Sequence, residues 1–302
     1  MGICYSDLWV YWQEKLRGVS FSTTITIGHQ NLFLSPIEVK LLRRSYYKEF
    51  PDSKIDPFAK LEFGVYADDV LCNLLGIQNL SSIDYSPYEG AIIIHDLNLT
   101  IPQDVVGRFD VVIENGSLEH IFNFPIAMSN IMKMAKIGGK LFITIPANNF
   151  CGHGFYQFGP ELMLKVFVQD NGFRLEKILF CPAKTDDFMA TSNRCLYELI
   201  DPAKITDAVQ LISKRPLLMI VEATRVADVP IFTHTPLQSY YVTLWNSDGS
   251  QHQLLDSNKL LENLYNRMPS FVQSTVKTFY SNKRISRRNS LSNSKVYNKL
   301  QI

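Results

Sequence analysis

The stretch from residue 109 to residue 146 constrains the fold more than any other part of this chain. It begins with the apolar run FDVVIENG, passes through an acidic loop and a helix-like segment, and ends with a Gly-Gly pair and KLFITIP. This order predicts a strand, a helix and a second strand that lies parallel to the first. Ligands of open α/β sheets bind beyond the carboxyl ends of the strands. The loop after Glu114 is therefore the first candidate for a site.

Short apolar runs alternate with helix-like segments along most of the chain. Besides the two strands above, five more are predicted: 21–30, NLSSIDYS, AIIIHDLN, 173–180 and 216–226. Helices are predicted between them, at about 66–76, 125–135 and 160–172. Such alternation predicts an α/β fold with a doubly wound, mostly parallel, seven-stranded Rossmann-like sheet.

The remaining segments suggest additions to one large domain, which is the usual organisation for a chain of 302 residues. We expect an N-terminal helix within residues 1–20 and an α/β domain over 21–226, with insertions at about 31–62 and 184–213. Residues 227–302 form a predicted C-terminal extension, which ends in a basic tail rich in serine and asparagine.

Composition excludes several classes of protein. Thirty basic and twenty-nine acidic side chains give a net charge of +1, which argues against a dedicated nucleic-acid binder. We find no secretory signal and no apolar run long enough for a transmembrane segment. Five cysteines without a CxxC pair are typical of the reducing cytoplasm, and no spacing indicates a metal site. Gly2 and Cys4 match a lipidation pattern that is short enough to arise by chance.

Acidic residues end three of the predicted strands in succession: Asp84, Asp96 and Glu114. Over residues 20–226, this arrangement resembles the class I S-adenosylmethionine-dependent methyltransferases. In that family the first acidic residue bonds the ribose, the second contacts the adenine amine, and the third begins a loop that faces the methionine part and the substrate. The resemblance implies S-adenosylmethionine as cofactor, with these candidate binding residues: Gly28, His29, Gln30, Asp84, Tyr85, Asp96, Leu97, Glu114 and Asn115.

Three strings narrow the resemblance: IDYSPYEGAIIIHDLN, NGSLEHIFN and GHGFYQFGPEL. They look like a branch of such proteins encoded among bacterial glycan and polysaccharide biosynthesis genes. This implies that the acceptor of the methyl group is a small polar molecule such as a sugar or glycan precursor.

One feature departs from the family pattern. The first strand of the family normally ends in a GxGxG loop, whereas this chain has Gly28 alone, and its next predicted helix begins only near Tyr66. Either the insertion at 31–62 folds aside as a lid while His29, Gln30 and Gly64 rebuild the pocket, or the cofactor site has been lost. The second possibility makes the protein a non-catalytic scaffold or binding protein.

Two polar loops supply the candidate catalytic residues. His120 follows the fourth predicted strand, and His153 and Tyr156 follow the fifth. Imidazole takes up protons near neutral pH, so His153 is the first candidate for a general base, and Tyr156 is expected to orient His153. His120 is the second candidate. Either histidine could instead only stabilise its loop. Amides, rings and a carboxylate that suit a polar acceptor are Glu119, Asn148, Phe155 and Gln157.

Overall fold

A computed structural model describes residues 2–61, 66–183, 195–200, 211–239, 242, 269, 272–273 and 289–302. The chain divides into two compact units. The first comprises Met1–Leu199, Ser213–Pro236 and Asn298–Ile302, and the second comprises Ile200–Ile212 and Leu237–Tyr297. Most of the predicted insertion at 184–213, Gly64, and the part of the basic tail before residue 289 lie outside the described residues.

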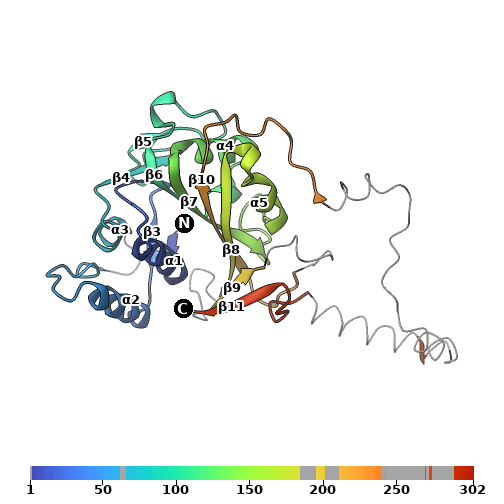
Figure 1. Ribbon diagram of the computed structural model, residues 1–302, viewed down its shortest axis with the longest axis horizontal. Helices are drawn as coiled ribbons and strands as arrows, with labels where there is room; N and C mark the ends of the chain where they lie inside the picture. The colour runs from blue at the N-terminus through green and yellow to red at the C-terminus, as the bar shows by residue number, and fades with distance from the viewer. Residues whose placement is uncertain are drawn as a thin grey trace. The chain divides into compact units, whose positions relative to one another are not determined.

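The first unit is built on a sheet that has nine strands in the described part of the chain, in the order β11-β9-β8-β10-β7-β6-β2-β4-β5 (Figure 1). Their bounds are β2 (Thr23–Ile27), β4 (Asn79–Asp84), β5 (Ile93–Ile94), β6 (Phe109–Asn115), β7 (Ala135–Asn148), β8 (Phe173–Pro182), β9 (Cys195–Leu199), β10 (Leu217–Arg225) and β11 (Tyr297–Gln301). All seven strands expected from the sequence are present, and β9 and β11 extend one edge.

The topology confirms the predicted fold class. Counted in chain order, the seven expected strands lie as 3-2-1-4-5-7-6. β2, β4, β5, β6 and β7 pair in parallel, while β10 runs antiparallel to both β7 and β8. The chain moves outward from β2 in one direction and returns to β6 on its other side. This reversal creates a topological switch point between β2 and β6, where α/β proteins bind ligands.

Helices cover the sheet because each parallel connection must cross over it in the right-handed sense. α3 (Asp68–Leu75) connects β2 to β4, and α4 (Phe124–Met134) connects β6 to β7. The two connections run in opposite directions along the sheet, so they place their helices on opposite faces. α5 (Pro160–Val166) lies between β7 and β8. Strand β6 is buried on both faces from Val111 to Asn115, as a central parallel strand requires.

The N-terminal segment and the insertion at 31–62 pack on each other. β1 (Gly2–Cys4) pairs in parallel with β3 (Asn31–Phe33), and α1 (Tyr5–Leu16) packs beside α2 (Pro36–Glu49). Trp12 of α1 is 1% exposed, and its indole nitrogen donates to Ser45 Oγ over 2.9 Å. The insertion therefore forms part of the hydrophobic core around α1.

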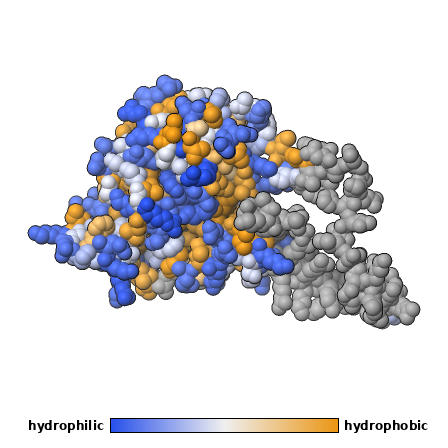
Figure 2. Space-filling view, in the orientation of Figure 1, coloured by the Kyte–Doolittle hydropathy of each residue, from blue (hydrophilic) through white to orange (hydrophobic). Residues whose placement is uncertain are grey.

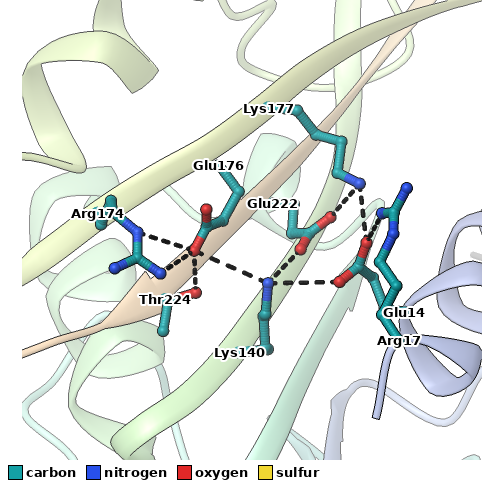
Figure 3. Close-up of polar contacts among 8 residues, drawn as sticks. All are labelled: Glu14, Arg17, Lys140, Arg174, Glu176, Lys177, Glu222 and Thr224. Atoms are coloured by element: carbon teal, nitrogen blue, oxygen red, sulfur yellow. Dashed lines mark hydrogen bonds and ion pairs between the residues drawn. The ribbon is translucent and has the colours of Figure 1, made fainter. Parts of the chain in front are cut away.

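A cluster of charged side chains lies between α1 and the strands β7, β10 and β8, and we call it the α1–sheet charge cluster (Figure 3). Lys177 Nζ lies 2.9 Å from Glu14 Oε1 and 2.9 Å from Glu222 Oε2. Lys140 Nζ contacts Glu222 and lies 3.5 Å from Glu14 Oε2. The lysines lower the pKa of Glu14 to about 2 despite the opposing effect of burial. The α1–sheet charge cluster also includes Arg17, Arg174 and Glu176, and the uncharged hydroxyl of Thr224 donates to Glu176 over 2.5 Å.

The surface of the described residues is mixed in polarity. Hydrophilic residues cover much of the face seen in Figure 2, with hydrophobic patches between them. In the described ranges, no helix combines the length and the apolar character that crossing a membrane requires. The cysteines are free thiols, and Cys4 is buried where β1 joins α1.

Candidate functional site

A cavity of about 270 Å³ lies at the carboxyl ends of the parallel strands, at the switch point between β2 and β6. Its lining comes from β2, β4 and the loops that follow β4, β5 and β6: Ile27, Gly28, Ile83, Asp84, Tyr85, His95, Asp96, Leu97, Asn98, Ser117, His120 and Ile121. Other hollows of about 390, 600 and 700 Å³ exist in the described part, but none has Asp84 or Asp96 in its lining.

The end of β2 forms part of the floor of the cavity. Gly28 has a φ of 72°, a left-handed conformation that favours glycine, and its N–H donates to the carbonyl of Ile83 over 2.8 Å. The hydroxyl of Ser117 donates to the carbonyl of Ile27 over 3.0 Å. These bonds join the ends of β2 and β4 to the loop after β6, which gives the cavity a rigid floor.

Two carboxylates from neighbouring strands face this cavity. Asp84 ends β4, and its Oδ1 accepts the N–H of Tyr85 over 2.6 Å. Asp96 follows β5, and its Oδ1 accepts the backbone N–H of Asn98 over 2.9 Å and its side-chain amide over 2.8 Å. These hydrogen bonds hold the pKa of Asp96 below its ordinary value. Charged carboxylates only accept hydrogen bonds, so they suit a ligand with hydroxyl and amine donors.

Asn130 of α4 holds the loop that carries Asp96. Its Oδ1 accepts the N–H of Ile101 over 3.1 Å, and its Nδ2 donates to the carbonyls of Leu97 and Leu99 over 3.1 and 2.7 Å. Asn130 is 1% exposed, so water cannot replace these bonds. One buried amide thus positions the wall of the cavity.

The structure does not place His29 and Gln30 in this lining. Both ring nitrogens of His29 are engaged, one with the Glu89 carbonyl at 2.6 Å and the other with Asp68 Oδ2 at 2.8 Å. Its ring also stacks on Tyr66 with 3.6 Å between the ring centroids. Gln30 is 1% exposed and donates to the carbonyl of Ile27 over 2.6 Å. The lining also includes no residue of the insertion at 31–62.

Glu114 and Asn115 also lie outside the lining. Glu114 is fully buried and its Oε1 accepts the N–H groups of Ser117 and Leu118, so it shapes the loop after β6 from within. Burial, and secondarily the charge of Glu119, raise the pKa of Glu114 to about 8. Asn115 points to the N-terminal segment, where its Oδ1 accepts the hydroxyl of Tyr11 over 2.7 Å.

The two predicted catalytic loops do meet. Glu119 and His120 lie in a short 3₁₀ turn, η2 (Leu118–His120), and His153 lies in the loop after β7. The ring centroids of His120 and His153 are 5.3 Å apart, and His153 Nε2 lies 3.6 Å from Glu119 Oε1. Burial raises the pKa of Glu119 to about 7 and lowers the pKa of both histidines. His120 lines the cavity, so the group formed by Glu119, His120 and His153 lies at the edge of the cavity.

The other predicted residues of the second loop have different contacts. The hydroxyl of Tyr156 donates to the carbonyl of Phe122 over 2.6 Å, which ties the two loops together. Gln157 Oε1 accepts the N–H of Phe150 over 2.7 Å, and Asn148 ends β7 opposite Leu217. Phe155 is 68% exposed and its ring meets that of Phe122 edge-on.

The predicted site residues leave out six residues of the lining, the strand residues Ile27 and Ile83 and the loop residues His95, Asn98, Ser117 and Ile121, as well as Asn130 behind it. His95 and Asn98 flank a predicted pair, and Ser117 and Ile121 lie in the loop after Glu114. Extending each predicted site through its whole loop would have included the four loop residues, and Ile27 and Ile83 each directly precede a predicted residue. Asn130 lies within a helical segment, where nothing in the local pattern distinguishes it.

Comparison with known proteins gives a limited result. No family model and no curated protein matches the sequence. Among solved structures, the N-methyltransferase NodS from Bradyrhizobium japonicum in complex with S-adenosylhomocysteine is 11% identical, with a TM-score of 0.40, over 74% of this chain and 86% of that one. A 16S rRNA adenine methyltransferase from Catenulisporales acidiphilia is 11% identical, with a TM-score of 0.34, over 73% of this chain and 94% of that one.

Proposed function

We propose that this protein transfers a methyl group from S-adenosylmethionine to a small polar acceptor, such as a sugar or glycan precursor. The observation that carries the proposal is the pair of carboxylates, Asp84 and Asp96, in one cavity at the switch point of the sheet. Asp84 ends the second of the seven core strands and Asp96 closely follows the third, in keeping with the family resemblance of the sequence.

The cavity fits the nucleoside part of this cofactor. Its volume of about 270 Å³ is near the lower end of ligand pockets, about 300 Å³. Asp84 retains Oδ2 as an acceptor for the ribose hydroxyls, while Asp96 can accept the adenine amine. Leu97 and Tyr85 provide apolar and aromatic surface beside them, and the left-handed φ of Gly28 lets the backbone turn where β2 ends.

The acceptor would bind at the edge of the cavity where His120 and His153 lie. When bound, the cofactor supplies a methyl group on a cationic sulfur, which keeps the electron pair of the broken bond as the acceptor oxygen or nitrogen forms the new one. The acceptor also loses a proton. His120 and His153 can take it, because their lowered pKa values keep them neutral at neutral pH. The exposed ring of Phe155 offers a stacking surface for a sugar.

Calorimetry with S-adenosylmethionine and S-adenosylhomocysteine tests the cofactor assignment. We expect micromolar binding that Asp84→Ala abolishes and that Asp104→Ala leaves unchanged, since Asp104 is exposed and outside the cavity lining. Unchanged affinity in Asp84→Ala would contradict the assignment.

A second function, a non-catalytic scaffold or binding protein, is favoured by the bonds that engage His29 and Gln30 outside the lining. Absence of binding by the unmodified protein at millimolar cofactor would support it. The search would then turn to partners of the loop that carries His153.

A further inference from the structure

Glu119, His120 and His153 each place a potential ligand atom within 4.8 Å of the others. His153 Nε2 and Glu119 Oε1 are 3.6 Å apart, which is longer than a hydrogen bond between nitrogen and oxygen. Two ligands of one ion, each bonded at about 2.1 Å, lie about 3.0 to 3.4 Å apart. The separation is thus closer to that of two groups that share an ion.

One oxygen of the Glu119 carboxyl group is buried without a partner among the described residues. The Glu119 side chain is only 2% exposed, and the oxygen without a hydrogen-bond partner is Oε2. Burying a carboxylate without partners is costly, and coordination of a cation is one way in which proteins offset that cost. The side chain of His153 is 33% exposed, which leaves a path from solvent to the group.

The loop after β7 is fastened to Glu119 through its backbone. The N–H groups of Phe155 and Tyr156 donate to the carbonyl of Glu119 over 2.7 and 3.3 Å. A Cβ at Gly154 would lie 2.8 Å from that carbonyl oxygen and 2.9 Å from Glu119 Cγ, so only glycine permits this approach. The two loops therefore keep the three side chains near one another, and small rotations of the side chains would bring ligand atoms that lie within 4.8 Å to the spacing that one ion requires.

We propose that Glu119, His120 and His153 bind one divalent transition-metal ion at the edge of the cavity. Two imidazoles and one carboxylate are a common protein ligand set for Zn²⁺ and for other first-row ions, and three protein ligands leave positions open for an exchangeable group. His120 also lines the cavity, which places the ion beside the proposed acceptor. Coordination would use the basic ring nitrogen of each histidine, so the histidines would take the acceptor's proton only in the metal-free protein. In the metal-bound protein the ion would instead orient an acceptor oxygen. That role rests on the proposed function, whereas the binding of metal does not.

Titration with Co²⁺, followed by visible absorption, tests the site, because the spectrum reports direct coordination. Cys151→Ser serves as the parent protein, since Cys151 is an exposed thiol in the same loop. We expect one Co²⁺ per chain, displaced by Zn²⁺, and binding about a hundredfold weaker in His153→Ala and in Glu119→Gln. His234→Ala, which removes an exposed imidazole elsewhere, should bind as the parent does.

Equal binding by the parent, His153→Ala and Glu119→Gln would overturn the proposal, as would the absence of a Co²⁺ spectrum at millimolar metal. Circular dichroism of each variant verifies folding, and His153→Ala should fold because its side chain is partly exposed. Asp84→Ala should keep Co²⁺ binding, while His153→Ala should keep binding of S-adenosylhomocysteine. Failure of the metal site and failure of the cofactor site can therefore be told apart.

Discussion

Replacing Lys140 by methionine should weaken the fold more than the loss of an ordinary surface charge. Lys140 belongs to the α1–sheet charge cluster, where its Nζ contacts Glu222 and lies 3.5 Å from Glu14 and 3.8 Å from Glu176. Its side chain is 14% exposed. Methionine keeps an unbranched apolar chain of similar length, so the substitution removes mainly the positive charge.

The expected cost follows from the burial of Glu222, whose side chain is 1% exposed. Breaking a buried ion pair by removing one partner costs about 3 to 5 kcal/mol. Lys177 remains 2.9 Å from the carboxylate, so we expect the lower end, about 3 kcal/mol. For a domain of this size the melting temperature should fall by about 6 to 12 °C, at about 2 to 4 °C per kcal/mol.

Lys136→Met is the matched control. Lys136 Nζ lies 2.9 Å from Asp110 Oδ1, but its side chain is 42% exposed. An ion pair in contact with water contributes about 0 to 1 kcal/mol. Urea unfolding and thermal melts of both variants at one pH and salt concentration give the comparison. Equal costs for the two substitutions would refute the reasoning that burial makes Lys140 important.

Two further predictions concern buried positions. Burial raises the pKa of Asp7 to about 6, so its contribution to stability is largest below about pH 4 and declines as the pH rises to about 6. The advantage of the wild type over Asp7→Asn in urea unfolding should fall by about 3 kcal/mol across that range, and a pH-independent difference would contradict this. Gly172→Ala should lower the melting temperature more than Gly138→Ala: both glycines have positive φ, but only at Gly172 would a Cβ meet a backbone oxygen, that of Ala227 at 2.4 Å. Equal losses would show that backbone conformation alone matters.

The sheet and the place of the cavity could be predicted from the sequence because both depend on local patterns. Apolar runs of strand length, separated by helical segments, leave few arrangements other than a doubly wound sheet. An acidic residue directly after a parallel strand must lie at the carboxyl edge of the sheet, whatever the details of packing. Asp84 and Asp96 were therefore predicted beside one another, and both line the cavity.

Residues at the ends of strands are harder to assign, because the direction of a side chain there depends on what packs against it. Asn115 directly follows Glu114, yet it bonds Tyr11 of α1, which lies far away in the sequence. Glu114 bonds the backbone of its own loop, and His29 is engaged by Asp68 and Glu89. No periodicity in these segments indicates such partners.

The sequence by itself determined the order of strands and helices and the edge of the sheet where a ligand can bind. Only the tertiary structure decided which polar side chains meet there. Glu119 and His153 belong to loops after different strands, and they approach because β6 and β7 are neighbours and Gly154 admits the second loop. Contacts between segments distant in sequence depend on the order of the strands within the sheet and on the path of the loops, and a local pattern of residues shows neither; it shows only the order of the elements along the chain.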